Sequence, residues 1–233
     1  VHPDIRRLLL TQKAFAEGGR VLAYYAYLQA DIVAKSADEA ERKRADELLG
    51  FLTPIVKAML TEAAIECTNH ALQVFGGHGY VKEWGMEQFV RDARITTIYE
   101  GTTQIQALDL LGRKIMGLQA AGLRHFLGEV GAFCQAQSGN PALAEFVAPL
   151  ARLAQEWEQL TREVGEAAMK DPEQVGAAAV DYLYYSGYVT LAYFWAREIA
   201  ALGPAHGEDF RASKLATARF WYQRIVPRTL AHV

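Results

Sequence analysis

The sequence predicts an all-α protein, with a helical bundle over residues 1–116 and a second helical unit over residues 117–233. Apolar side chains recur along most of the chain at the spacing of a helix that buries one face. Glycine and proline fall between these stretches, where they begin or end helices. No segment shows the strict alternation of apolar and polar residues that is typical of a half-buried strand, so no β-sheet is predicted.

The first helix is predicted over residues 3–36. Pro3 suits a first helical turn, because the missing N–H removes no hydrogen bond there. A stretch of mixed charge follows at residues 38–47 and is predicted to be a solvated helix face. A long helix is then predicted over residues 53–74, with Pro54 at its start.

Three glycines end that long helix, at positions 76, 77 and 79. A short helix is predicted over residues 86–94, and another from Thr102 to about Met116. Residues 117–122 are poor in helix formers and are predicted to join the two units. The second unit contains four more predicted helices. They are expected over residues 123–137, 141–169 and 173–201, with a last helix that ends near Pro227.

Net charge, cysteine content and the length of apolar runs exclude several classes of function. The 233 residues carry a net charge of -3 with no clustered basic stretch, which argues against a nucleic-acid-binding module. Cys67 and Cys134 lie in apolar, helix-like stretches without a histidine at metal-ligand spacing, so we expect buried free thiols and no metal site. A reducing compartment, the cytoplasm, fits this cysteine usage. No uninterrupted apolar run approaches about 18 to 20 residues, so no membrane span is expected.

The informative stretch is 73–106, QVFGGHGYVKEWGMEQFVRDARITTIYEGTTQIQ. Glycine lets backbone N–H groups approach a ligand closely, although most glycine turns only end a helix. Glu100 stands between the apolar Ile98-Tyr99 pair and flexible Gly101. A carboxylate beside apolar groups becomes a stronger base. Local chemistry alone favours the simpler interpretation, a carboxylate facing the N-terminus of the next helix.

The order of these pieces resembles the C-terminal signature of acyl-CoA dehydrogenases. The matching elements are Q-V-F-G-G-x-G-Y, then R-D-A-R, then I-Y-E-G-T-T-Q-I-Q. The resemblance extends from about His2 to about Met116 and implies the family's four-helix-bundle-like C-terminal domain. The second half resembles, more loosely, the extension of a long bacterial subgroup that includes 3-methylmercaptopropionyl-CoA dehydrogenase-like proteins. We therefore expect a piece of a longer chain, without the family's N-terminal helical domain and β-barrel.

The resemblance implies roles for seven positions. Glu100 corresponds to the base that removes the α-proton of an acyl-CoA thioester, while the β-hydrogen passes as hydride to flavin N5 and a trans-2-enoyl-CoA forms. Tyr99 corresponds to a residue that lines the acyl pocket. The positions that the family uses to contact FAD are Thr102 and Gln104 for the subunit's own cofactor, and Gln73, Gly76 and Gly77 for that of a neighbouring subunit.

Other positions are expected to be structural. Arg91 and Asp92 match the R-D-A element, and His78, where many relatives have asparagine, is given no catalytic role. The resemblance also implies an acyl-CoA substrate and electron-transfer flavoprotein as electron acceptor. A homodimer is favoured, because the extension would cover one of the interfaces of the family's tetramer.

Three alternatives stay open. An acyl-CoA oxidase shares the glutamate but passes electrons to oxygen. A non-catalytic helical interaction module would keep the fold without the chemistry, and retention of Glu100 argues against it. The family's DNA-repair-associated branch expects a basic surface, which the acidic charge balance disfavours. The acyl chain length is not predicted.

Overall fold

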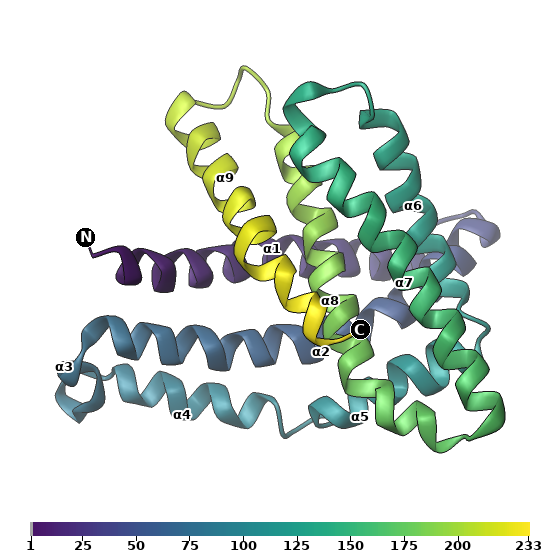
Figure 1. Cartoon of the computed structure of the whole chain (residues 1–233), viewed down its shortest axis with the longest axis horizontal. Coiled ribbons are helices and arrows are strands. Elements are labelled where there is room, and N and C mark those ends of the chain that lie inside the picture. The colour runs from purple at the N-terminus through teal and green to yellow at the C-terminus, as the bar shows by residue number, and fades with distance from the viewer. Residues whose placement is uncertain (1) are drawn as a thin grey trace.

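The computed structural model describes residues 2–233, and every regular element in that range is helical, which confirms the all-α prediction. Figure 1 shows the arrangement. The α-helices are α1 (Pro3–Lys35), α2 (Glu39–Phe75), α3 (Gly77–Tyr80), α4 (Met86–Thr96), α5 (Thr103–Leu108), α6 (Ala121–Gln137), α7 (Ala144–Lys170), α8 (Glu173–Ala201) and α9 (Glu208–Phe220). Five shorter helical turns are η1 (Lys82–Trp84), η2 (Asp109–Gly117), η3 (Pro141–Leu143), η4 (Trp221–Ile225) and η5 (Val226–Ala231).

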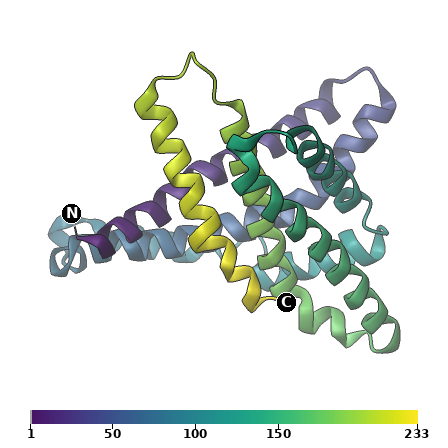
Figure 2. The ribbon, with the colours of Figure 1, turned by 45° about the horizontal axis from the view of Figure 1, so that its top comes forward.

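The two longest helices, α1 and α2, pack against each other along their lengths (Figures 1 and 2). Asp38 begins α2, because its carboxylate accepts a hydrogen bond from the Ala40 N–H at 2.8 Å. The predicted start at Pro54 is wrong, since α2 runs through this residue. Proline removes one hydrogen bond and crowds the preceding turn. Here Pro54 is buried in the core, and tertiary packing on both sides keeps the helix continuous.

The end of α2 is sharper than a simple turn. Gly76 has φ of 60°, a left-handed value that glycine tolerates, and its N–H bonds to the Gln73 carbonyl at 3.0 Å. The single turn α3 and the 3₁₀ turn η1 follow directly. Gly79 is buried there, and a Cβ on it would lie 2.5 Å from the Leu72 carbonyl oxygen. The chain therefore reverses within a few residues, and α4 returns along α2.

The predicted junction after Met116 is irregular in the structure. α5 continues into the π-helix η2, and Gln119 and Ala120 then take φ of 50° and 55°. These left-handed values turn the chain into α6. The domain boundary at Met116 stays a prediction, because residues from both sides form one hydrophobic core.

The centre of that core is α8, which packs against α1, α2, α5 and α7. Fifteen of its residues are buried, in the middle and C-terminal part of the helix. Their aromatic side chains meet partners from both predicted units. The ring centroid of Phe194 lies 5.2 Å from that of Tyr25 in α1, and the ring centroid of Tyr193 lies 5.3 Å from that of Phe126 in α6. Figure 2 shows α6, α7 and α9 around α8.

The chain after α9 continues beyond the predicted end near Pro227. The π-turn η4 and the 3₁₀ turn η5 follow, so that Pro227 lies inside a helical turn and not at a helix end. A proline is tolerated near the start of such a turn, where its missing N–H costs no internal bond. Trp221 and Ile225 are buried, which places this segment against the core.

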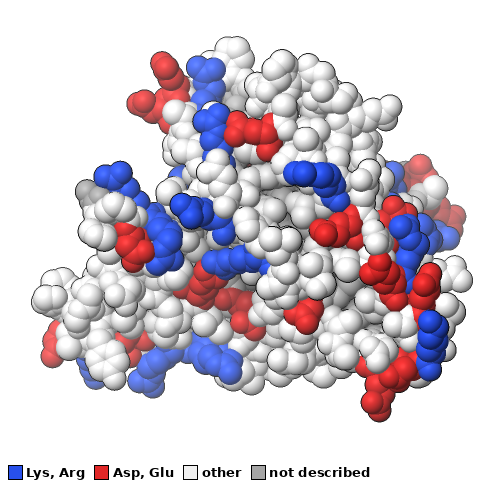
Figure 3. Space-filling view, viewed as in Figure 1, with Lys and Arg blue, Asp and Glu red and all other residues white. Residues whose placement is uncertain are grey.

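One helix, α2, contains a window that is long and apolar enough to cross a membrane by length and composition. Within the fold 44% of this window is buried, against α1, α4 and the second half of the chain. Core packing accounts for its apolar character. Figure 3 shows acidic and basic side chains interspersed over one face of the molecule.

Candidate functional site

Glu100 lies in the short connection between α4 and α5, in a strained backbone conformation. Its φ is 56° and that of Gly101 is 92°, so two consecutive residues occupy the left-handed region. Such values are uncommon for a residue with a Cβ and recur both in tight turns and at functional sites. The Glu100 side chain is exposed on the surface of the chain. The sequence motif predicts Glu100 as the base but does not predict this geometry.

Three hydrogen bonds hold this connection in place. The Lys57 ammonium of α2 donates to the Gly101 carbonyl at 2.5 Å. The buried Thr103 hydroxyl donates to the Glu62 carboxylate of α2, also at 2.5 Å. The Gln106 amide donates back to the Glu100 carbonyl at 3.1 Å. The backbone around Glu100 is therefore fixed from α2 on one side and from α5 on the other.

Apolar residues on either side of Glu100 in the chain remain exposed. Ile98 is 48% exposed, Tyr99 49% and Ile105 57%. Isolated apolar residues at a surface are ordinary, but these three flank one carboxylate in the chain, and we refer to them as the apolar patch, which another surface can cover. Covering this patch would remove water from the Glu100 side chain. Tyr99 directly precedes Glu100 in the chain, and its assignment to the acyl pocket stays a prediction.

The two positions expected to contact the subunit's own FAD follow Glu100 closely. Thr102 begins α5, where its hydroxyl oxygen accepts a hydrogen bond from the Ile105 N–H at 3.3 Å. Gln104 lies in the first turn of α5 with its side chain exposed. Both positions therefore border the Glu100 connection.

The other three predicted positions lie in the turn at the end of α2. Gln73, Gly76 and Gly77 are all exposed, and a Cβ on either glycine would meet nothing within 4 Å. An aromatic contact within the turn helps to hold its conformation, because the rings of His78 and Trp84 pack with centroids 5.2 Å apart. This contact agrees with a structural role for His78.

The structure separates these two groups of residues. The glycine turn and Glu100 lie at opposite ends of α4, whose eleven residues span about 16 Å at the usual rise of a helix. Arg91 and Asp92 lie on α4 between them, where the Asp92 carboxylate accepts a bond from the Gln88 amide at 2.6 Å. The predicted residues therefore do not form one compact site within this chain.

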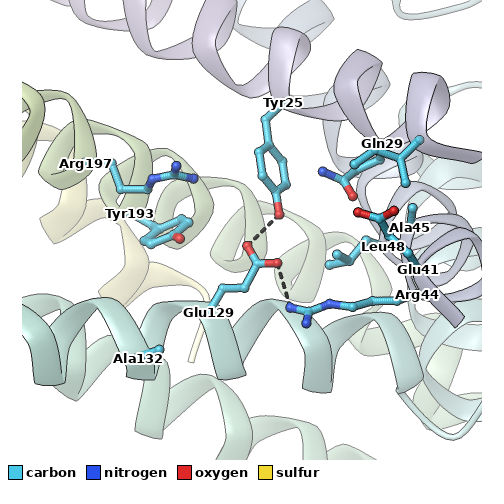
Figure 4. A pocket seen from close by; sticks show the side chains of 11 residues that line it. Tyr25, Gln29, Glu41, Arg44, Ala45, Leu48, Glu129, Ala132, Tyr193 and Arg197 are labelled. Atoms are coloured by element: carbon cyan, nitrogen blue, oxygen red, sulfur yellow. Dashed lines mark hydrogen bonds and ion pairs between the residues drawn. The ribbon is translucent and has the colours of Figure 1, made fainter. Parts of the chain in front are cut away.

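Figure 4 shows a second polar cluster, in a cavity of about 510 Å³ between α1, α2, α6 and α8. Glu129 of α6 accepts a bond from the Tyr25 hydroxyl at 2.5 Å and forms an ion pair with Arg44 at 3.0 Å. Arg197 lies over the Tyr25 and Tyr193 rings, 5.9 and 5.5 Å from their centroids. Burial, together with the Glu129 charge, raises the pKa of Tyr25, so its hydroxyl stays protonated and donates. The cluster joins the two predicted units.

Sequence reasoning missed Lys57, Glu62 and Gln106, which hold the Glu100 connection. Lys57 and Glu62 lie more than thirty positions earlier in the chain, and nothing in their local sequence marks them. Only the packing of α2 against the following segments brings them together. Among residues 2–233, no group of three or more His, Cys, Asp or Glu side chains is arranged to hold a metal ion.

Comparisons with known proteins agree along the whole chain. The family model described as "Acyl-CoA dehydrogenase, C-terminal domain" matches residues 1–116, and the model described as "Acetyl-CoA dehydrogenase C-terminal like" matches residues 126–233. The chain is 37% identical to a 3-methylmercaptopropionyl-CoA dehydrogenase of Ruegeria pomeroyi, over 97% of this chain and 39% of that protein. It thus spans well under half the length of this curated relative.

Two solved structures share the fold. An acyl-CoA dehydrogenase from Bacillus anthracis, complexed with FAD, superposes with a TM-score of 0.76 at 17% identity, over 99% of this chain and 41% of that chain. Caenorhabditis elegans ACDH-11, in complex with C11-CoA, also gives a TM-score of 0.76, at 19% identity, over 91% of this chain and 34% of that chain.

Proposed function

The chain belongs to the acyl-CoA dehydrogenase family, and we propose that it supplies the catalytic base, Glu100, of an FAD-dependent enzyme that dehydrogenates an acyl-CoA thioester between its α and β carbons. The observation that carries the proposal is the motif glutamate held in a strained, anchored connection within an exposed apolar patch. Left-handed φ values also turn the chain at Gln119 and Ala120, so the support for chemistry at Glu100 comes from the motif together with the bonds that anchor its connection.

In this proposal Glu100 takes the α-proton of the thioester onto a carboxylate oxygen and holds it as a neutral carboxyl. A thioester α-proton is too weak an acid for a carboxylate in water, so the site must strengthen the base. Covering Ile98, Tyr99 and Ile105 would remove water from Glu100 and disfavour its charged form. One oxygen of the Glu100 carboxylate accepts the proton. Lys57 and Glu62 meanwhile hold the backbone of the connection in place.

The residues near Glu100 fit FAD, the cofactor of the related Bacillus anthracis structure. Thr102 and Gln104 border the same connection, and the open space beside Gly76 and Gly77 leaves backbone groups accessible to a second cofactor molecule. When bound, FAD supplies the acceptor for the β-hydrogen as hydride. The length of α4 between the two groups supports their assignment to cofactors of two neighbouring subunits.

The partners follow from the same proposal. The substrate is an acyl-CoA, the class bound by the related Caenorhabditis elegans structure, and the product is the trans-2-enoyl-CoA. Electron-transfer flavoprotein accepts the electrons, and the enzyme acts in fatty acid metabolism in the cytoplasm. The free state of Cys67 and Cys134 is consistent with a reducing compartment.

The test replaces Glu100 by glutamine in the full-length protein that contains this chain. Glu100→Gln keeps the shape and removes the base, so flavin reduction by acyl-CoA should slow by roughly 10²- to 10⁴-fold in stopped-flow absorbance. Glu166→Gln, at an exposed glutamate on α7, is the matched control and should leave the rate unchanged. Near wild-type flavin reduction in Glu100→Gln would refute the assignment.

A further inference from the structure

Glu62 of α2 lies between the Glu100 connection and the second half of the chain and faces both. On one side its carboxylate accepts the hydrogen bond of the Thr103 hydroxyl at 2.5 Å. Thr103 is only 4% exposed, so this bond is shielded from competing water. Because Thr103 is three residues from Glu100, the bond fixes the start of α5 and with it the end of the strained connection.

On its other side Glu62 borders a cavity of about 330 Å³ formed with α8 and the C-terminal segment. Tyr184 of α8 lines this cavity beside Glu62, and burial followed by the Glu62 charge raises the pKa of Tyr184 to about 12. The phenol is therefore protonated near neutral pH, and Tyr184 and Glu62 are linked through the cavity that both side chains line. His232 stacks on Tyr184, with ring centroids 5.2 Å apart.

The same stretch of α2 is tied to the C-terminal segment one helical turn later. Arg228 of η5 binds Glu66 through two parallel hydrogen bonds of 2.6 and 2.7 Å. A bidentate arginine–carboxylate pair of this kind is strong and directional. This ion pair joins the C-terminal segment to α2. Glu66 lies one turn after Glu62, so both glutamates lie on the same face of α2.

We propose that Glu62 is a positioning residue through which α8 and the C-terminal segment hold Glu100 in place. The proposal rests on the proposed function for its catalytic consequence. Two adjacent left-handed residues relax unless they are anchored, and the anchor of Thr103 is a carboxylate that also faces the extension. The extension therefore contributes to the reaction without touching the substrate.

The experiment compares three substitutions in the full-length protein. Glu62→Leu removes the shared carboxylate, Thr103→Val removes the hydroxyl on the loop side, and Tyr184→Phe removes the hydroxyl on the extension side. Amide hydrogen exchange of residues 98–104 should accelerate about tenfold in Glu62→Leu and Thr103→Val, the effect of losing a hydrogen bond to a charged group. Tyr184→Phe should accelerate exchange of the same amides by a smaller factor. Thr103→Ser keeps the hydroxyl, so exchange in this variant should equal that of the wild-type protein.

A matched control lies inside the extension. There the Tyr185 hydroxyl donates to Glu156 at 2.6 Å, so Glu156→Leu breaks a tyrosine–glutamate bond within the extension, far from Glu100 in the sequence. It should leave exchange at residues 98–104 unchanged. In stopped-flow kinetics, Glu62→Leu should lower the limiting rate of flavin reduction about tenfold while the dissociation constant for acyl-CoA stays constant.

Two results would overturn the proposal: unchanged exchange at residues 98–104 in both Glu62→Leu and Thr103→Val, or an equal response in Tyr184→Phe and Glu156→Leu. Hydrogen exchange does not depend on Glu100 being the base. A fast Glu100→Gln enzyme with loosened amides in Glu62→Leu would therefore refute the proposed function and leave the structural coupling intact.

Discussion

At the residue scale, the site depends on backbone conformations that few side chains accept. Glu100 has a left-handed φ of 56° and Gly101 one of 92°, and the latter is a value at which a Cβ is strained. A Cβ on Gly101 would also lie 2.8 Å from Nε2 of Gln106, the atom that donates to the Glu100 carbonyl. Glycine is thus favoured at 101 chiefly for its φ, and a side chain there would also displace the flexible Gln106 amide from its bond to the Glu100 carbonyl.

Gly101→Ala should therefore lower the free energy of unfolding by about 1–3 kcal/mol, measured by urea denaturation. Gly128→Ala provides the control, because Gly128 lies within α6 with nothing within 4 Å of its Cβ position. Alanine there should stabilise the protein by about 0.5–1 kcal/mol. Equal effects of the two substitutions would contradict the strain at Gly101.

The cysteines give a second prediction at this scale. Burial, and then the Glu66 charge, raises the pKa of Cys67 to about 12, and burial raises the pKa of Cys134. The thiolate reacts with disulfide reagents, so the folded protein at pH 8 should react much more slowly than the urea-unfolded chain. Because the folded pKa exceeds the unfolded value, the thiol's contribution to stability is complete below about pH 8.5 and decreases at higher pH. Rapid labelling of the native protein would refute this.

At the scale of elements, most helices follow from the sequence. The predicted helices over residues 3–36, 123–137 and 173–201 agree closely with α1, α6 and α8. Glycine or proline marks every one of these ends except the C-terminal end of α1, which is followed by Ser36. The errors at Pro54 and Pro227 share one cause. Local propensity at a proline predicts an interruption, while tertiary packing keeps the segment helical. The motif identified Glu100, but its anchors Lys57 and Glu62 depend on contacts between distant segments.

The cluster around Glu129 tests how the elements are joined. Tyr25→Phe removes the hydroxyl that α1 donates to α6 and should lower the free energy of unfolding by about 1–2 kcal/mol, because the lost bond ends on a charged group. The comparison is Glu145→Gln at the Arg219 pair, where the two side chains are 40% and 48% exposed. That surface pair should contribute less than about 1 kcal/mol. Urea denaturation measures both, and the reverse order would be inconsistent with a joining role.

At the scale of the whole molecule, the second half of the chain completes the core of the first. Trp157, Trp195 and Trp221 are fully buried, and Trp221 packs against Phe15 of α1 with ring centroids 5.1 Å apart. The extension is therefore more than a tethered addition. The resemblance alone located its beginning near Met116, but the shared core became visible only in the packing of α8.

Truncation after Met116 should accordingly abolish cooperative folding of the remaining chain. The deletion would expose the core side chains of α1 and α2 that α8 covers, and a bundle with such an exposed apolar face aggregates. Near-ultraviolet circular dichroism and a thermal melt measure the effect. A sharp melt with native-like signal in residues 1–116 would show two independent units.

Assembly belongs to the same scale. We predict a homodimer for the full-length protein, because the extension occupies one side of the bundle formed by α1 and α2. Light scattering coupled to size exclusion measures the mass directly. A tetramer would contradict the idea that the extension blocks one interface. Point substitutions on exposed faces are better suited than truncation for locating the remaining interface, since they leave the core intact.

The distribution of tryptophans also provides two optical reporters in one chain. Of the four indoles, three are fully buried in the shared core, while Trp84 is 57% exposed beside the glycine turn. Emission from the buried three should be blue-shifted and change only when the core opens. Trp84 should emit at longer wavelength and be accessible to a small aqueous quencher such as iodide. Replacing Trp84 by phenylalanine would then separate unfolding of the core from events at the turn in a single fluorescence experiment.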